Sequence, residues 1–336
     1  MAGKSGRSLA AVPEKSLKKI ILSWEGMLFL LFIAVNIFCK CISPVYTFTN
    51  VLREMPKYLT EIFLLFPMAY ILLMGEIDIS VGSIVCLSAT MTCIASNAGM
   101  PFPLALLAGL LTGTACGMIN GLLTVKFREL PTMIITLGTQ IVFRGIAEIV
   151  LGNGGSVSLA NADGFRKIAG KIGPFPYLFF IVIICAVIFT VIADKKVFGR
   201  RLYAIGSNER TSFYSGIKVN RMLFTAYTVL GLLAGLSAIF LTSVTYGANT
   251  TTGQGFEMDA IAMAVFGGIS TAGGKGKLLG GVISAFVIIC LRVGLGQINM
   301  NPQVILIILG ALLILAVLLP NITQSINQKK KKASNS

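Results

Sequence analysis

The stretch PLALLAGLLTGTACGMINGLLTV, residues 103–125, is an apolar run in which glycine recurs at every fourth position. A helix of about 20 apolar residues is long enough to cross the hydrocarbon core of a bilayer. Four glycines share one face of this helix: Gly109, Gly113, Gly117 and Gly121. Small residues at this spacing let a second backbone approach closely, so we expect tight helix packing along the face. A backbone-lined solute path is the alternative, and Gly231 and Gly235 repeat the spacing later in the chain.

The composition of the whole chain agrees with this segment. Its 336 residues are 55% hydrophobic and 12% charged, and the mean hydropathy is +0.85. Soluble domains carry about 25% charged residues, so a chain with half that share needs lipid as its solvent. The sequence predicts an all-α polytopic membrane protein with about ten transmembrane helices, of which the eighth is short enough to be a broken helix. The expected spans are 21–40, 58–74, 80–97, 103–125, 131–151, 176–193, 222–244, 258–270, 278–296 and 303–319.

The basic residues indicate the orientation of these spans. Most of the 28 lysines and arginines gather at the N-terminus, in loops that would share one side of the membrane, and at the C-terminus. Cytoplasmic loops carry such an excess, so we expect both termini in the cytoplasm. The predicted organisation is a basic N-terminus (1–20), a transmembrane domain (21–320) with a cytoplasmic loop (194–222), and a basic tail (321–336).

Several other classes of protein are excluded. The net charge of +15 does not indicate nucleic-acid binding, because the basic clusters are separated by apolar segments without interleaved aromatic residues. The chain has no histidine, and its seven cysteines form no C-x-x-C motif, so we expect no metal site. No cofactor motif is present either. The first apolar run is too long for a signal peptide and lacks an A-x-A cleavage site.

The glycine-rich stretch GGISTAGGKGKLLGG, residues 267–281, is not a nucleotide-binding loop. A phosphate loop has the pattern G-x-x-x-x-G-K-[ST]. Relative to Lys275, the first glycine is replaced by Ile269 and the Ser or Thr by Gly276. We expect this stretch to be a structural turn, in which glycine permits a tight reversal and close helix contact.

The segment GEIDISVGS, residues 75–83, places two carboxylates next to apolar sequence. A carboxylate at membrane depth is costly, so Glu76 and Asp78 should face a partner or a water-filled cavity. Two roles stay open for Asp78 and Ser80: capping of the helix that follows, or direct contact with a passing solute.

A second set of polar candidates lies within predicted spans. Thr136, Gln140 and Arg144 fall on one helix face, and Glu148 extends it and could pair with Arg144. Asn120 is a similar candidate in the preceding span. Such residues usually face protein or a pore rather than lipid. Hydroxyl and amide groups would suit a sugar-like solute, and hydrogen bonding between helices is the alternative.

The loop KKVFGRRLYAIGSNERTSFYSGIKVNRM is about 28 residues long, whereas most helix connections have 2–8. Its glycines divide it into what we expect to be two small helices on the membrane face. Arginines alternate there with apolar Leu202, Ile205 and Phe213, as at a protein interface. The loop is either a docking platform for a cytoplasmic partner or a basic surface held by anionic lipid.

Four segments of the chain resemble the permease subunits of bacterial ABC importers of the ribose, xylose and galactose class, which includes permeases for rhamnose and autoinducer-2. GEIDISVGS is similar to the family's G-I-D-L-S-V-G-S, and LPTMIITLGTQIVFRG to its P-x-F-I-x-T-L-G-T…R-G. FGRRLYAIGSNERTSFYSGIKVNRM resembles its coupling loop, and GQGFEMDAIAMAVFGGISTAGGKG its G-Y-E-L-x-A-I-A…G-G-T-S-x-x-G-G-x-G. The resemblance runs from about residue 50 to 320. Two positions depart from it: Glu76 is an additional acid, and Ile269 replaces the usual threonine.

The resemblance implies a non-catalytic transport subunit in the bacterial inner membrane. Two permease copies, or this chain with a sister chain, would form the path for a sugar delivered by a periplasmic binding protein, while cytoplasmic ATPase subunits dock on the coupling loop. It implies ATPase contact at Gly199, Arg200, Arg201, Ala204, Gly206, Asn208, Ser215 and Gly216. The competing hypothesis is an ion-coupled secondary transporter, which would need ionisable residues near the bilayer midplane. The few acids within spans lie mainly near span ends, which favours the ATP-driven importer.

Overall fold

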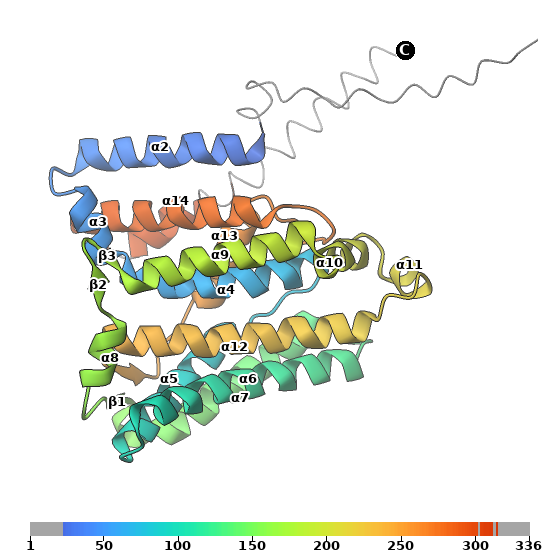
Figure 1. Cartoon of the computed structure of the whole chain (residues 1–336), viewed down its shortest axis with the longest axis horizontal. Coiled ribbons are helices and arrows are strands. Elements are labelled where there is room, and N and C mark those ends of the chain that lie inside the picture. Colours follow the sequence, from blue (N-terminus) through green and yellow to red (C-terminus); the bar gives the residue numbers. More distant parts are fainter. Residues whose placement is uncertain (1–22, 302, 312–313, 315–336) are drawn as a thin grey trace, which may run out of the picture.

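The long helices of the chain lie roughly parallel to one another in a computed structural model, which describes residues 23–301, 303–311 and 314 (Figure 1). The predicted basic ends, 1–20 and 321–336, lie outside these residues, as do residues 312–313 and 315–319 of the last expected span. Every other predicted span coincides with a helix. Within the described ranges, seven helices are long and apolar enough to cross a membrane: α2 (Trp24–Ile42), α4 (Pro56–Leu73), α6 (Phe102–Lys126), α7 (Thr132–Leu151), α9 (Tyr177–Lys195), α12 (Val219–Thr245) and α14 (Leu278–Gln297).

Shorter elements connect and complete the bundle. Two are apolar helices, α5 (Val81–Asn97) and α13 (Phe256–Phe266), and the 11 residues of α13 confirm that this segment is too short for a full span. Residues 303–311 are also helical. The remaining elements are α3 (Phe48–Glu54), η1 (Gly152–Gly154), β1 (Ser156–Ser158), α8 (Asp163–Ile168), β2 (Lys171–Ile172), β3 (Phe175–Pro176), α10 (Val197–Ser207), α11 (Glu209–Tyr214) and β4 (Gly247–Asn249).

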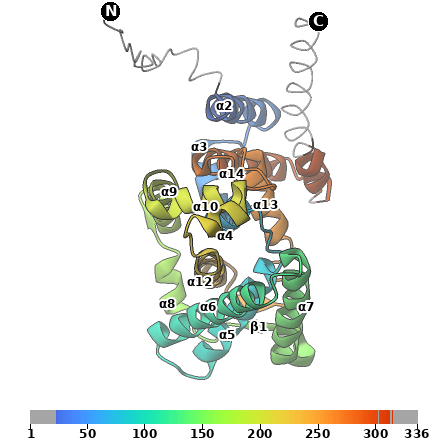
Figure 2. The ribbon, with the colours of Figure 1, turned by 90° about the vertical axis from the view of Figure 1, so that its right-hand side faces the viewer.

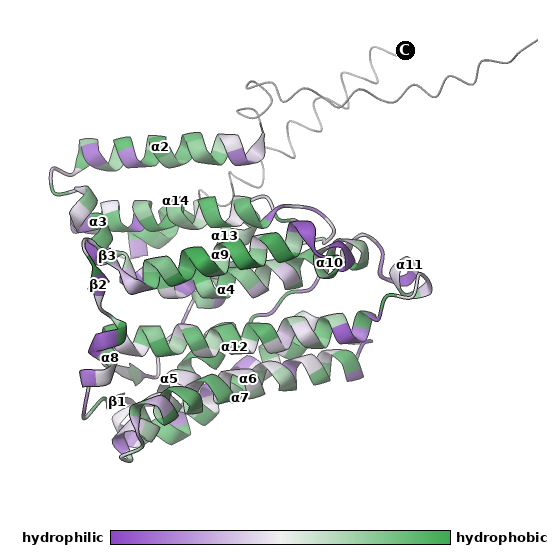
Figure 3. Cartoon of the chain, viewed as in Figure 1, coloured by the Kyte–Doolittle hydropathy of each residue, from purple (hydrophilic) through white to green (hydrophobic). Residues whose placement is uncertain are grey.

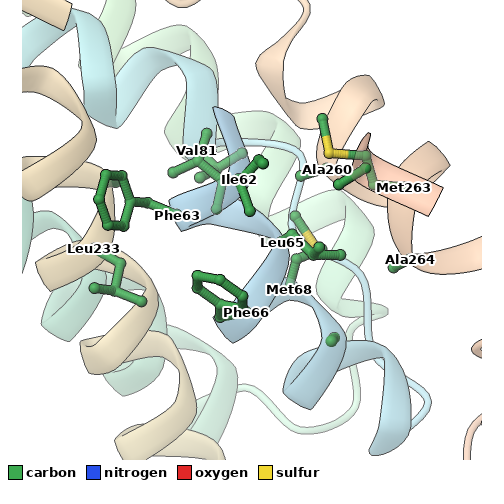
Figure 4. Close-up of a cluster of buried hydrophobic side chains, with 14 of the residues drawn as sticks. Ile62, Phe63, Leu65, Phe66, Met68, Val81, Leu233, Ala260, Met263 and Ala264 are labelled. Atoms are coloured by element: carbon green, nitrogen blue, oxygen red, sulfur yellow. The ribbon is translucent and has the colours of Figure 1, made fainter. Parts of the chain in front are cut away.

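Helix α4 forms the centre of the bundle. Its apolar window is 83% buried, whereas that of α2 is 17% buried and that of α7 is 22% buried. Figure 2 looks along the helices and places α2 and α7 on opposite outer sides of α4. Phe63 and Phe66 of α4 stack on Phe240 of α12 and Phe189 of α9, respectively, and aliphatic side chains of α13 pack on its opposite side (Figure 4). The outer faces of α2 and α7 keep apolar side chains exposed, as lipid-facing helices do.

The glycine-lined face of α6 packs tightly against another helix, as the sequence predicts, and the structure shows that this helix is α12. A Cβ added at Gly117 would lie 2.4 Å from the carbonyl oxygen of Tyr227 and 2.7 Å from the Cα of Gly231. A Cβ at Gly113 would lie 2.8 Å from the Cα of Gly235. Backbones in contact leave no room for a solute at this position. Gly109 differs from its neighbours, because it faces Thr92 of α5.

Polar residues gather at the two ends of the bundle (Figure 3). At one end β1 pairs antiparallel with β4, β2 pairs with β3, and α8 lies close by. At the other end, the long loop forms the two predicted small helices, α10 and α11. This separation places the polar loops on opposite sides of an apolar slab.

Candidate functional site

Three of the polar residues singled out in the sequence meet where the α4–α5 connection touches α6. Asp78 is fully buried, and its Oδ1 accepts hydrogen bonds from the backbone N–H and the hydroxyl of Ser80, each at 2.7 Å. The Nδ2 of Asn120 donates to the Ser80 hydroxyl at 2.7 Å and lies 3.4 Å from Asp78 Oδ2. A buried carboxylate is tolerated here because these donors replace the water it loses.

The structure differs from the expected capping role. Ser80 precedes α5, but its backbone is already helical and neither its hydroxyl nor Asp78 accepts a hydrogen bond from an N–H of the first turn. Both side chains are occupied with each other and with Asn120 instead. Capping by the Ser80 side chain is therefore wrong, whereas Asp78 accepts the N–H of Ser80 directly before α5, and both side chains close a buried polar cluster.

Two further predicted residues hold this connection to α7. Thr136 accepts a hydrogen bond from the backbone N–H of Ile79 at 3.2 Å. Glu76 accepts one from the hydroxyl of Thr132 at 2.7 Å and pairs with Arg128 at 2.6 Å. The additional acid of this motif is therefore a structural link between the connection, α7 and the end of α6.

The rest of the predicted polar face on α7 serves another segment. The guanidinium of Arg144 donates to the carbonyl oxygens of Thr250 and Thr252, at 2.9 and 2.8 Å, and so fixes the loop before α13. The expected pair between Arg144 and Glu148 does not form, and Glu148 is exposed. Gln140 is half-buried, and its side chain has no hydrogen bond within the described part of the chain.

Several buried acceptors lie in or beside this cluster, and of their residues the sequence analysis singled out only Asn120. Glu257, at the start of α13, is buried beside Gly82, and its Oε2 has no hydrogen-bond partner among the described residues. The same holds for Asn120 Oδ1, Thr124 Oγ1 and the hydroxyl of Tyr227. Their pattern gave no signal because they come from three helices far apart in the sequence. Together they make the interior where α5, α6, α12 and α13 approach one another polar.

A buried ion network lies apart from this cluster. Arg292 of α14 pairs with Glu61 of α4 at 3.0 Å and with Asp259 of α13. One positive and two negative side chains inside apolar segments were a usable sequence signal for such a network. Because removing one member of a buried pair leaves an uncompensated charge, the network fastens α13 to the central helices.

Helix α10 is attached to the body of the chain. Leu202 and Ile205 are 0% and 2% exposed, so the expectation that they belong to an outward interface is wrong. A Cβ at Gly206 would lie 1.9 Å from the carbonyl oxygen of Leu73, which already accepts a hydrogen bond from Gly274 N–H at 2.9 Å. The hydroxyl of Tyr203 donates to the carbonyl of Gly276 at 2.9 Å. The glycine-rich turn is therefore structural, as predicted, and its contact is α10.

Helix α11 projects away from the bundle at the end of the loop (Figure 1). It begins after Asn208, whose side chain accepts a hydrogen bond from Thr211 N–H, and ends before Gly216, whose φ of +83° favours glycine. Phe213 and Tyr214 are 65% and 85% exposed, and their rings pack edge to face. The sequence analysis singled out Phe213 and missed Tyr214, although two adjacent aromatic residues in a polar loop were a visible signal.

The remaining residues of the predicted contact set divide between the two helices. Gly199 is buried against the backbone of Ala193, so it shapes the loop from inside. Arg200 and Arg201 are exposed, and Ala204 is half-buried. Ser215 is exposed, and its hydroxyl donates to the carbonyl of Thr211. The outward surface is therefore basic on α10 and aromatic on α11.

Arg128 joins the loop to the α4–α5 connection. Its guanidinium contacts Glu209 of α11 at 2.7 Å and Glu76 at 2.6 Å. Partial burial by itself would lower the pKa of the Arg128 guanidinium, but hydrogen bonds and charge from Glu209 and Glu76 raise it. Arg128 stays charged and links α11 to the segment that carries Asp78.

Within the ranges that the structure describes, no group of three or more His, Cys, Asp or Glu side chains is placed to hold a metal ion. The polar side chains at the Asp78 cluster are amides, hydroxyls and carboxylates from different elements. This arrangement is suited to binding or positioning.

Comparison with known proteins identifies relatives along most of the chain. A family model described as "Branched-chain amino acid transport system / permease component" matches residues 58–317. The ribose import permease protein of Bacillus subtilis (strain 168) is 35% identical over 293 residues, which cover 87% of this chain and 90% of the relative. The D-allose transport system permease protein of Escherichia coli (strain K12) is 34% identical, covering 94% of this chain and 98% of the relative.

Two further comparisons extend this result. The autoinducer 2 import system permease protein of Salmonella paratyphi B (strain ATCC BAA-1250 / SPB7) is 33% identical over 75% of this chain and 77% of the relative. A chain from an ABC transporter assigned to the metal-chelate type, solved in an inward-facing conformation, has a TM-score of 0.51 with 13% identity. It covers 91% of this chain and 98% of its own length. At that identity the likeness concerns the fold alone.

Proposed function

Because the chain belongs to the branched-chain amino acid transport system / permease component family, and is a non-catalytic permease subunit of an ABC transporter, we propose that it forms the translocation path for a monosaccharide or sugar-like solute. The observation that carries the solute class is the near full-length similarity to permeases named for ribose and D-allose. The third relative is named for autoinducer 2, so the proposed class includes other small sugar-like solutes.

The buried polar cluster supports a sugar rather than the branched-chain amino acid in the family description. An aliphatic side chain would need an apolar pocket, because pockets select ligands by matching polar and apolar groups. The interior beside Asp78 instead offers unpaired acceptors on Asn120, Thr124 and Tyr227. Hydroxyl groups of a sugar are donors that could satisfy them.

We assign the proposed partners from the charge of the loops at the two ends of the bundle. Cytoplasmic ATPase subunits dock on α11 and the outer face of α10, a periplasmic binding protein delivers the solute to the end with α8 and β1, and a second permease completes the path. In this arrangement the chain crosses the bacterial inner membrane about ten times with both termini in the cytoplasm. The basic residues of the loop support this orientation.

We further propose that Arg128 transmits movement from the ATPase to the membrane interior. Glu209 lies on α11, directly beside the exposed aromatic pair, and Glu76 lies two positions before Asp78. A displacement of α11 during ATP binding pulls or releases Arg128 and thereby shifts the α4–α5 connection. Coupling of this kind needs an element with two arrangements, and the ion pairs at Arg128 provide the contact that can change.

Uptake into proteoliposomes tests the proposed function. The permease is reconstituted with its ATPase and binding protein, ATP is supplied on the cytoplasmic side, and labelled ribose, allose and leucine are offered on the other side. We expect ATP-dependent accumulation of a sugar and none of leucine. Leucine uptake would contradict the proposed solute class. Uptake driven by a proton or sodium gradient without ATP would favour the ion-coupled transporter instead.

A further inference from the structure

A basic hollow lies on the outer surface where α10 meets the start of α12. It has a volume of about 380 Å³, and three cationic side chains, Arg201, Lys218 and Arg221, line it above apolar Phe198 and Met222. No acidic residue contributes to its lining. Three positive charges around one hollow repel each other, so an anion is needed to neutralise them.

The three cations are free to bind such an anion. Within the described ranges, the side chains of Arg201, Lys218 and Arg221 form neither an ion pair nor a hydrogen bond. The basic residues nearby differ, since Arg128 is held by two glutamates. The positive charge of the hollow is therefore not compensated by the described parts of the chain.

An apolar groove continues from this hollow along the bundle. It has a volume of about 450 Å³ and lies between the last turns of α6 and the first turns of α12, with Leu122, Val125 and Phe224 in its lining. Arg221 and Thr225 line both the hollow and the groove, so the two are adjacent. The groove runs along two helices that are long and apolar enough to span a membrane.

We propose that the hollow and the groove together bind an anionic phospholipid. The three cations contact its phosphate headgroup, and an acyl chain lies in the groove. Basic pockets between helices at the membrane surface bind anionic headgroups, and each nearby cation strengthens such binding about fivefold. An acyl chain is poorly solvated by water and fits an apolar groove, whereas a free anion does not. The groove beside the basic hollow therefore selects a lipid over a free anion.

The continuity of the two surfaces also favours a lipid over a protein partner. A soluble protein could contact the basic residues, but the groove follows Leu122 and Phe224 into the membrane-spanning part of α6 and α12. A lipid at this position contacts Phe198 and Arg201 of α10 as well as Arg221 of α12. It therefore fastens α10 to the bundle from the outside, opposite to the contact that Gly206 makes from the inside.

Lipid binding to the full-length permease alone tests this proposal, so its outcome does not depend on the proposed transport function. The protein in a neutral detergent is titrated with phosphatidylglycerol, with phosphatidylcholine of the same acyl chains, and with inorganic phosphate, and thermal unfolding reports binding. We expect phosphatidylglycerol to bind at least about tenfold more tightly than phosphatidylcholine. Inorganic phosphate should give no comparable stabilisation.

Four variants sharpen the test. Arg221→Gln and Lys218→Gln should each weaken phosphatidylglycerol binding about fivefold, with an unchanged unfolding temperature in the absence of lipid. Lys195→Gln removes an exposed cation outside the hollow and is the matched control, which should bind as the parent does. Leu122→Gln, in the groove, should weaken both phospholipids alike.

Four outcomes would overturn the proposal. Equal affinity for the two phospholipids would show that the negative headgroup charge does not contribute to binding. Equal stabilisation by inorganic phosphate would show that the site binds simple anions rather than a lipid. An effect of Lys195→Gln as large as that of Arg221→Gln would show an unspecific charge effect. If Arg221→Gln bound phosphatidylglycerol normally but lost the ATPase, the hollow would be a protein contact.

Discussion

Helices α10 and α11 follow each other directly in one loop and have similar mixtures of basic and apolar residues, yet they are placed in opposite ways. The apolar side chains of α10, Leu202 and Ile205, are buried within the chain. Those of α11, Phe213 and Tyr214, are the most exposed aromatic pair in the loop. Helix α10 anchors the loop, and α11 exposes the side chains that we propose contact the ATPase.

The cause of this difference lies far from the loop in sequence. Gly206 has no side chain, so α10 can approach the end of α4 and the turn at Gly274 closely. Helix α11 lacks such a contact with the turn, and Arg128 pairs with it only at Glu209, its first residue. The comparison teaches that glycine contacts position the elements of this protein, while exposed aromatic side chains identify the surface proposed to meet the ATPase.

The largest expected effect comes from breaking the closest glycine contact. In Gly117→Leu the side chain would overlap the backbone of α12, at a cost of about 3 kcal/mol or more, a large part of the stability of a typical domain. We expect most of the folded protein to be lost from detergent extracts, measured by size-exclusion chromatography. Ala115→Leu, at an exposed site on the same helix, is the control. Normal yield and transport for Gly117→Leu would mean that α6 and α12 do not pack as described.

A smaller, local effect on stability is expected at α10, the helix that anchors the loop. Gly206→Val places a side chain against Leu73 and Gly274 and should detach α10 at a cost of about 2–3 kcal/mol. The bundle should stay folded, but trypsin should cleave the loop at its arginines much faster than in the parent. Thr211→Val, on the exposed side of α11, should leave cleavage unchanged. Parental cleavage of Gly206→Val would place α10 away from the turn.

Substitutions on α11 should give the opposite pattern, in which stability is unchanged and association with the partner is weakened. The double variant Phe213→Ala, Tyr214→Ala removes exposed side chains, so the unfolding temperature of the permease should not change. Association with the ATPase should weaken about thirtyfold or more, because a buried aromatic anchor contributes about 2 kcal/mol. Co-purification at graded ATPase concentrations measures this loss. Undiminished association would move the contact to the outer face of α10 or to the turn at 273–277.

The smallest effect on assembly is expected for the link between the two regions. Arg128→Gln removes two partly exposed ion pairs, which contribute about 1 kcal/mol or less. The complex should still assemble, but stimulation of ATP hydrolysis by solute and binding protein should fall. Lys126→Gln, at an exposed neighbouring position, is the matched control. Full stimulation in Arg128→Gln would exclude the proposed transmission through Glu76.

The sequence predicted the parts of this structure that depend on local pattern. Apolar runs located the helices, and four-residue glycine spacing predicted tight packing along one face of α6, although not that its partner is α12. The two small helices of the loop were expected, but Gly199 and Gly206 lie inside α10 and the break falls at Asn208. The meeting of Asp78, Ser80 and Asn120 was not predictable, although each residue was singled out, because their contact depends on how α6 packs against the α4–α5 connection. The direction of the Leu202 and Ile205 side chains was predicted wrongly for the same reason, because a distant turn decides which face of α10 is buried.

Photochemical crosslinking from α11 tests the central claim most directly. A benzophenone amino acid replaces Tyr214 in a complex that carries out ATP-dependent uptake, and the same amino acid at Ala115 serves as the membrane-facing control. Illumination should join position 214 to the ATPase subunit, and position 115 should give no such product. A transporting complex in which position 214 forms no product with the ATPase would contradict the assignment of α11 as the docking helix.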